Sequence, residues 1–179
     1  MYSFFMPLAE LHLALLSLRP AHGYDLKREY DASFPNARPL PFSQVYSTLG
    51  RLVRDGLAEV IETRSEGGPE RIVYAITDAG REQLRNWFAE PAPPTATGAE
   101  DLVRKVILAL RTGDCVSSVV AGQRVAHLRA MQTLSTAPPD GDDLGAWLAR
   151  RYAALHLEAD LRWLDGAATA LDAAASTTS

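Results

Sequence analysis

Ser43-Gln-Val-Tyr-Ser-Thr-Leu-Gly-Arg-Leu-Val-Arg-Asp55 is the stretch that decides the fold. It predicts a helix, because an apolar stripe recurs at helical spacing: Val45, Leu49, Leu52 and Val53. The complementary positions follow the same repeat and form an outward face: Ser43, Tyr46, Ser47, Gly50, Arg51 and Arg54. The outward face carries hydroxyls, a glycine and two arginines but no acidic residue. One side of this helix is therefore expected to pack in a core, and the other to meet a polar partner.

The segments on either side of this helix are separated by glycine and proline. Gly56 ends the helix, as a C-terminal glycine commonly does, and Thr77 is a good N-cap for a later helix. Two runs after Gly56 are rich in β-branched residues and predict strands. The expected order is helix 7–18, helix 24–31, helix 43–55, strand 57–64, strand 71–77 and a helix from Thr77 to before Pro91.

The two predicted strands form a hairpin, and the loop of residues 65–70 lies at its tip. A two-stranded hairpin is marginal in water, so it must pack against the helices and project its tip outward. Arg64 and Arg71 flank the tip on opposite strands, with Gly67 and Gly68 between them, where they could meet phosphates or a minor groove. Three helices followed by such a wing predict a winged helix-turn-helix, in which helix 43–55 enters a major groove of double-stranded DNA.

The proline-rich segment 91–99 predicts a linker between two domains. Residues 1–90 would form the winged helix-turn-helix, and residues 100–179 an α-helical domain. In the last predicted helix, a heptad-like seam suggests a homodimer interface: Leu157, Leu161, Leu164 and Leu171. A similar stripe precedes it: Leu144, Leu148, Tyr152 and Leu155. The fold class is thus mainly α with a small β-hairpin (α+β), comprising an N-terminal winged helix-turn-helix and a C-terminal helical dimerisation domain.

Charge and cysteine content bound the partners and the compartment. The net charge is −4, and residues 1–90 hold 10 Lys or Arg against 12 Asp or Glu, so any DNA site must be a local basic surface. A single cysteine, Cys115, cannot form an internal disulfide, and no segment resembles a secretory signal or a membrane span. We expect a cytoplasmic protein without a membrane partner.

Less specific interpretations stand beside these hypotheses. The outward face of helix 43–55 could simply be solvated, and the Gly67 and Gly68 tip could be only a tight turn. Tyr24, Leu26 and Tyr74 are expected in the core rather than at DNA. Because the net charge is acidic, a winged-helix module that binds another protein without binding DNA is the alternative function.

No cofactor, metal or catalytic function is predicted. The histidines at positions 12, 22, 127 and 156 are scattered without a ligand spacing, and the motifs of serine hydrolases, phosphate-binding loops and dinucleotide-binding turns are absent. The protein is therefore not expected to be an enzyme. Trp147, Tyr152 and Trp163 could line a pocket for a small aromatic or drug-like effector, or could serve only in packing.

Three motifs resemble those of PadR-type transcriptional regulators, in particular the longer subgroup with a helical dimerisation domain. They are His22-Gly-Tyr-Asp25, then Val45-Tyr-Ser-Thr-Leu-Gly-Arg-Leu52 with Asp55-Gly-Leu57, and Arg71-Ile-Val-Tyr-Ala-Ile-Thr-Asp-Ala-Gly80. Two looser matches lie in the second domain, Arg104-Lys-Val-Ile-Leu108 and Leu161-Arg-Trp-Leu164. The resemblance spans nearly the whole chain.

The resemblance implies a homodimer, usually a repressor, that binds an operator with two-fold symmetry. In some members a small phenolic or drug-like effector releases the DNA. The family often has a proline where this chain has Ser47 and a basic residue where it has Gly50, so the resemblance implies no particular base preference.

Overall fold

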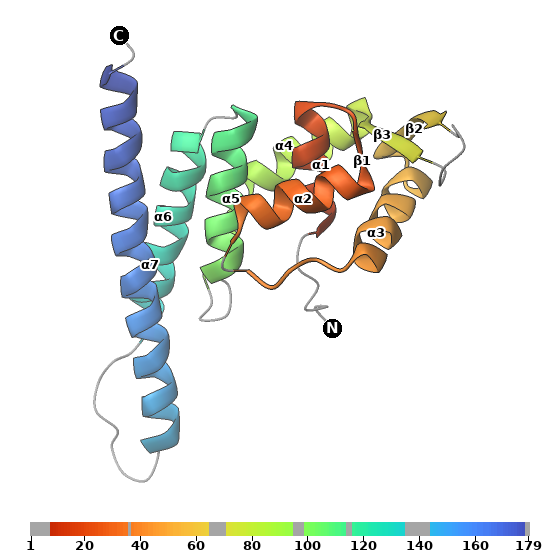
Figure 1. The fold of residues 1–179 in the computed structure, drawn as a ribbon. Coiled ribbons are helices and arrows are strands. Elements are labelled where there is room, and N and C mark those ends of the chain that lie inside the picture. The colour runs from red at the N-terminus through yellow and green to blue at the C-terminus, as the bar shows by residue number, and fades with distance from the viewer. Residues whose placement is uncertain are drawn as a thin grey trace. The chain divides into compact units, whose positions relative to one another are not determined.

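The computed structural model describes residues 8–35, 37–64, 71–94, 99–113, 116–134 and 144–177. The chain forms two compact units, Met1–Phe88 and Ala89–Ser179. Figure 1 shows the helices and strands of both units. The described residues of the predicted linker segment, 91–94 and Ala99, fall within the second unit.

The N-terminal unit contains α1 (Leu8–Leu18), β1 (Ala21–His22), α2 (Gly23–Ser33), α3 (Phe42–Arg54), β2 (Ala58–Arg64), β3 (Arg71–Ile76) and α4 (Asp78–Ala89). The predicted order of helices and strands is confirmed, with boundaries that differ by one or two residues. The structure adds β1, a strand of two residues that the sequence analysis did not predict. Two residues are too few to show the alternation by which a strand is recognised.

The sheet has the order β1-β3-β2, and both pairings are antiparallel. Ala21 pairs with Tyr74, and the His22 Nδ1 atom lies 3.0 Å from the carbonyl oxygen of Ile72. β1 therefore covers one edge of β3 and ties the start of α2 to the hairpin. At the far end of the hairpin, Arg64 pairs with Arg71.

The core of the N-terminal unit is built around α1, which contacts α2, α3 and β3. Buried side chains come from every helix of the unit: Leu11, Leu15, Leu26, Tyr30, Val45, Leu49, Leu52, Leu84 and Phe88. Leu26 and Tyr74 are buried as expected, but Tyr24 is 58% exposed, so the prediction that Tyr24 belongs to the core is wrong. Tyr24 lies in the first turn of α2, on the side away from the buried Leu26 and Tyr30.

Hydrogen bonds hold the start of α4 close to the end of α3. The Thr77 hydroxyl donates a hydrogen bond to the carbonyl oxygen of Gly56 (2.7 Å) and accepts one from the Gly80 amide (3.1 Å), so Thr77 is the predicted N-cap. Gly56 has a φ of +72°, which favours glycine. A Cβ at Gly80 would lie 2.1 Å from the Leu57 carbonyl oxygen, so only glycine allows this close approach.

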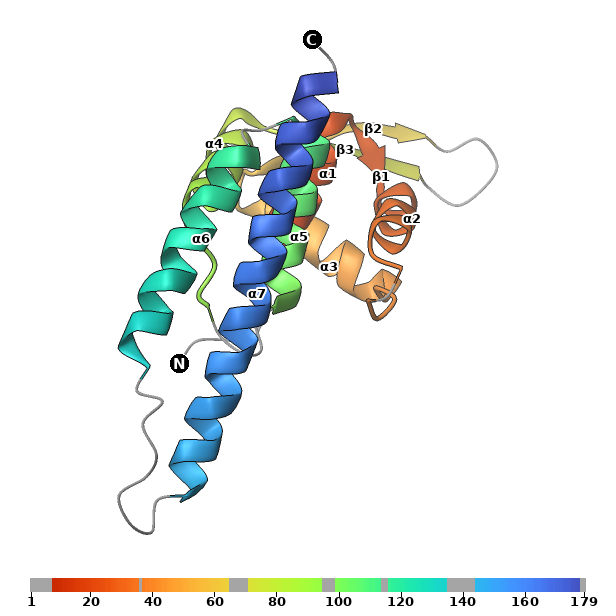
Figure 2. The same ribbon diagram turned by 90° about the vertical axis from the view of Figure 1, so that its left-hand side faces the viewer.

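The C-terminal unit contains α5 (Ala99–Thr112), α6 (Val116–Thr133) and α7 (Leu144–Thr177). α6 packs against both α5 and α7, and the two views show α6 and α7 side by side along much of their length (Figures 1 and 2). Among the described residues, no helix combines the length and apolar character that a membrane crossing requires.

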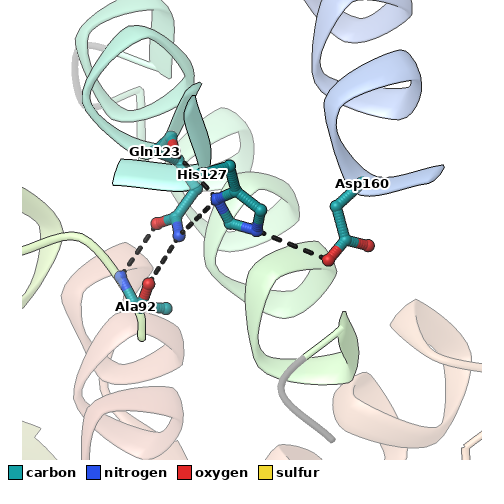
Figure 3. A network of polar contacts seen from close by, with 4 residues as sticks. All are labelled: Ala92, Gln123, His127 and Asp160. Carbon is teal, nitrogen blue, oxygen red and sulfur yellow. Dashed lines mark hydrogen bonds and ion pairs between the residues drawn. The ribbon is translucent and has the colours of Figure 1, made fainter. Parts of the chain in front are cut away.

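A buried polar network joins three segments of this unit (Figure 3). The Gln123 side chain accepts a hydrogen bond from the Ala92 amide (2.8 Å) and donates one to the Ala92 carbonyl oxygen (2.7 Å). The His127 ring lies beside it, with Nδ1 2.8 Å from the Gln123 carbonyl oxygen and Nε2 3.4 Å from Asp160 of α7. Gln123 therefore pairs with the backbone of Ala92 much as a neighbouring strand would, and His127 connects it to α7.

Candidate nucleic-acid interface

The outward face of α3 is exposed throughout. All six residues predicted for it are accessible to solvent: Ser43, Tyr46, Ser47, Gly50, Arg51 and Arg54. On the opposite side, Val45, Leu49 and Leu52 are buried as predicted, Val53 is half-buried, and Thr48 joins the buried set. Burial of the apolar side of α3 thus fixes the polar side toward solvent.

The charge on this face is concentrated in the last turn of α3. Arg51 and Arg54 lie there, and Arg54 forms an exposed ion pair with Asp55, with 3.1 Å between Nε and Oδ1. An exposed pair of this kind is weak, so Arg54 can exchange its carboxylate partner for a phosphate at small cost. Near the middle of the face, the Ser47 hydroxyl donates to the Gln44 carbonyl oxygen (3.1 Å), which leaves its oxygen lone pairs to accept hydrogen bonds.

The hairpin adds part of the predicted interface. The register places the backbones of Arg64 and Arg71 opposite one another at the end of the described hairpin. Gly67 and Gly68 lie outside the described residues, as do the side chains of the two arginines. β2 contacts α3, so the wing and the exposed helix face belong to one body.

Phe42, the first residue of α3, was missed by the sequence analysis. Phe42 precedes the predicted face and is exposed, and its ring stacks between those of Tyr24 and Tyr46. A spacing of four residues between Phe42 and Tyr46 would have placed both rings on one side of a helix. The place of Tyr24 in this stack could not be predicted from such a spacing, because Tyr24 belongs to α2.

Tyr46 lies against the start of α2 rather than standing free. A Cβ at Gly23 would lie 2.7 Å from the Tyr46 ring, so glycine at that position makes room for it. Burial raises the pKa of the Tyr74 phenol, and the neighbouring Tyr46 phenol raises it further. Tyr46 is therefore held between α2 and the sheet while about half of its surface remains exposed.

Comparison with known proteins identifies the family of this chain. The model of the transcriptional regulator PadR-like family matches residues 12–86. The probable transcriptional regulator Rv1176c of Mycobacterium tuberculosis is 30% identical over 181 residues, covering 89% of this chain and 96% of that protein. The chain belongs to the PadR-like family of transcriptional regulators. This membership confirms the family resemblance and the expectation that the protein is not an enzyme.

Solved structures of PadR-like proteins are similar over most of the chain. PadR of Bacillus subtilis in complex with operator DNA is 20% identical, with 90% of this chain and 96% of that chain covered and a TM-score of 0.46. The same protein in complex with p-coumaric acid is 20% identical, with 92% and 98% covered and a TM-score of 0.41. The PadR-like regulator BC1756 of Bacillus cereus is 17% identical, with 96% and 99% covered and a TM-score of 0.42. Membership of the family rests on the sequence matches.

The residues predicted to line an effector pocket do not converge in this PadR-like chain. Trp147 is half-buried, whereas Tyr152 is exposed and its ring packs on His156 at 3.9 Å between centroids. Trp147 and Trp163 are separated by roughly 24 Å along the axis of α7, at about 1.5 Å per residue. They cannot line one small pocket within a single copy of α7.

The two stripes of α7 lie on different sides of the helix. Leu157 and Leu164, from the predicted dimer seam, are buried inside the protomer, and Leu161 and Leu171 are half-buried. The earlier stripe is open to solvent, with Leu144, Leu148, Tyr152 and Leu155 between 47% and 57% exposed. The predicted seam packs within the chain, so it is not available in full to a second copy.

No metal site is apparent in the part of the chain that the structure describes, where no three His, Cys, Asp or Glu residues gather closely enough. His12 and His127 are both buried, but in different units and with different neighbours. The His12 Nδ1 atom lies 2.5 Å from the Leu8 carbonyl oxygen, and burial lowers the His12 pKa below its ordinary value of 6.5.

Proposed function

We propose that this PadR-like regulator binds an operator in double-stranded DNA through the outward face of α3, as a homodimer that represses transcription. The exposed polar face of α3 carries the proposal, because the helix buries its apolar side and presents hydroxyls and two arginines without an acidic residue among them. Ser43, Tyr46 and Ser47 would lie near base edges, and Arg51 and Arg54 near phosphates or guanines.

Local charge reconciles this role with an acidic chain. The net charge of −4 opposes long-range attraction to DNA, but in physiological salt a phosphate interacts mainly with charges that lie within about 8 Å. α3 itself carries no carboxylate, and Asp55, which directly follows its last turn, is paired with Arg54. In the hairpin, Arg64 and Arg71 pair with one another next to the loop of residues 65–70 and add two positive charges to the chain there. Gly67 and Gly68 belong to the proposed wing contact.

The homodimer interface is proposed on the open stripe of α7. Leu144, Leu148, Tyr152 and Leu155 form a continuous apolar strip that a second copy of the same strip would cover. Of the seam predicted from sequence, the half-buried Leu161 and Leu171 remain candidates for the edge of the interface. A two-fold dimer would read two half-sites whose centres lie about 10 base pairs, or a multiple, apart.

Release of the operator by a small aromatic or drug-like effector belongs to the same proposal. It rests on the family resemblance and on the aromatic residues of α7. Trp147 and Trp163 are far apart along one helix. An aromatic pocket around Tyr152, in the proposed dimer strip, would therefore need aromatic residues of the partner subunit. An effector there would alter the dimer and thereby the spacing of the two α3 helices.

The test is a binding assay of the full-length protein against the DNA upstream of its own gene and against a pool of random duplexes, at two salt concentrations. We expect selective binding that weakens as salt rises. Arg51→Ala should bind more weakly, and if Arg51 contacts a phosphate the salt slope should fall by about one unit. Arg85→Ala, at an exposed arginine of α4, is the matched control and should bind like the parent chain.

The opposite result has a defined meaning. If neither the upstream DNA nor any selected duplex is retained in preference to bulk DNA, the DNA-binding proposal is wrong. The alternative of a winged helix that binds a protein, which the acidic net charge favours, would then take its place.

A further inference from the structure

Three aromatic rings form an exposed stack on the N-terminal unit, which we call the aromatic ladder: Tyr24, Phe42 and Tyr46. The Tyr24 and Phe42 centroids are 5.8 Å apart with 13° between the ring planes, and those of Phe42 and Tyr46 are 6.5 Å apart with 22°. The three residues are 58%, 43% and 48% exposed. Large apolar surfaces clustered in this way usually mark a site that contacts a partner.

The ladder is held in position by its neighbours. Glycine at position 23 lets the Tyr46 ring lie against the start of α2. The Lys27 ammonium lies 5.2 Å from the centre of the Phe42 ring, and it also pairs with Asp31 at 2.5 Å. The rings are therefore arranged before any partner arrives, so little side-chain entropy remains to be lost on binding.

The place of the ladder points to DNA. Phe42 is the first residue of α3 and lies one turn before Tyr46, so it borders the polar face at its N-terminal end. In helix-turn-helix proteins, the N-terminal residues of the second helix reach the base edges while the first helix crosses the backbone. The ladder and Lys27 come from these two helices, at that end.

The chemistry of the ladder narrows what it would contact. In the major groove, the one apolar group that a base pair presents is the 5-methyl group of thymine, and phenylalanine is among the residues that pack on it. The serines and arginines on the rest of the α3 face offer a methyl group less apolar surface than an aromatic ring does. An apolar ring at the entrance of the face can bury this methyl group.

We propose that Phe42, supported by Tyr24 and Tyr46, packs on a thymine methyl group in each operator half-site and so contributes to sequence preference. This inference rests on the proposed function, since it requires α3 to lie in a major groove. It adds Phe42 as a reading residue and Tyr24 as the residue that positions it.

The experiment removes the methyl group and the ring separately and together. An operator duplex selected from random DNA with the full-length protein is resynthesised with deoxyuridine in place of each thymine in turn. Uracil lacks only the methyl group. We expect one symmetry-related thymine per half-site at which uracil weakens binding of the parent chain about fourfold for each methyl group. Phe42→Ala should bind the unmodified operator more weakly and lose nothing further from uracil at that position.

Two more variants separate contact from folding. Phe42→Leu keeps an apolar side chain and should retain part of the uracil effect, whereas Arg85→Ala, at an exposed position of α4 outside the proposed interface, should keep the full effect. Thermal unfolding of each variant checks that the unit is folded. Uracil tolerated at every thymine, or an equal uracil effect in the parent chain and in Phe42→Ala, would overturn the inference while leaving DNA binding intact. Failure to recover any selective operator would overturn the proposed function as well.

Discussion

α3 and α7 each bury one side and expose the other, but the side chains on their exposed sides differ. Each helix buries one stripe of side chains inside its own unit. The stripe consists of Val45, Leu49 and Leu52 in α3, and of Leu157 and Leu164 in α7. The exposed side of α3 is polar and basic with an aromatic border, whereas the first half of α7 exposes an apolar strip of three leucines and Tyr152. Burial alone therefore does not identify a binding surface, because both buried stripes belong to the fold.

The difference assigns a different partner to each surface. Hydroxyls and guanidinium groups remain hydrated until they meet hydrogen-bonding groups and phosphates, so α3 suits a nucleic acid. Exposed leucines gain most from leaving water, at about 25 cal/mol per Å² of apolar surface, so α7 suits a protein, and a second copy supplies a matching strip. The following predictions test this division, beginning with the largest expected effect.

Leu148→Glu should break the homodimer. The substitution places a carboxylate in the middle of the apolar strip in both copies, and we expect association to weaken by at least about 100-fold. Analytical ultracentrifugation measures this directly. Because two linked half-sites act together, affinity for a full operator should fall in parallel, while affinity for one isolated half-site should change little.

Ala149→Glu is the matched control for that variant. Ala149 is the next residue and is exposed, but it points away from the strip. It should leave the chain dimeric. A Leu148→Glu chain that sediments as a dimer would move the interface to another surface.

Gln123→Leu should lower the free energy of unfolding of the C-terminal unit by about 2 kcal/mol. The change removes both hydrogen bonds to the Ala92 backbone and leaves the half-buried N–H and C=O groups unpaired. Urea unfolding followed by circular dichroism at fixed protein concentration gives the value. Arg124→Gln, on the same helix, breaks only an exposed ion pair with Asp165 and should cost less than about 1 kcal/mol. Equal losses in the two variants would mean that the network does not stabilise the unit.

Gly50→Ala and Gly166→Ala compare α3 and α7 directly. Both glycines are exposed inside a helix, and a Cβ at either position would meet nothing within 4 Å. Each change should raise the free energy of unfolding by about 0.5–1 kcal/mol, since alanine favours the helix. Only Gly50→Ala should weaken operator binding, because its methyl group would stand between α3 and the DNA. Unchanged operator affinity in Gly50→Ala would show that the centre of the α3 face does not approach DNA closely.

The sequence predicted the helices well because their apolar residues repeat locally. Val45, Leu49 and Leu52 mark the buried side of α3 without reference to any other segment, and Thr77 signals the start of α4 by its own side chain. Tyr24 was misplaced because it lies on the side of α2 away from the buried Leu26 and Tyr30, and its stacking on Phe42, which belongs to another helix, left no local pattern. β1 was missed because it becomes a strand only by pairing with β3.

The second unit shows the same limit more clearly. A heptad-like repeat records that Leu157 and Leu164 lie on one side of α7, but it does not distinguish packing on α6 from packing on a second chain. The structure makes this distinction, because the two leucines are buried within one protomer. Gln123 carried no recognisable signal, since its partner is the backbone of Ala92, which any residue could supply.

The two buried histidines extend the comparison to pH. His12 has an apolar setting, and its Nε2 atom has no hydrogen-bond partner among the described residues, whereas His127 faces Asp160. Burial lowers the His12 pKa in the folded chain below the 6.5 of the unfolded chain. Near pH 6 the unfolded chain therefore binds more protons at this position, and stability falls as pH falls. The contribution of neutral His12 is fully present above about pH 6.5 and is lost below it.

Between pH 7 and pH 6 the loss from His12 should reach at most about 0.7 kcal/mol. Urea unfolding at the two pH values measures it, and His12→Leu should remove this part of the pH dependence because leucine does not titrate. His156→Gln, at a histidine on the outer part of α7, is the control for general effects of removing an imidazole. If His12→Leu and the parent chain lose equal stability on acidification, His12 is not the group whose titration destabilises the fold.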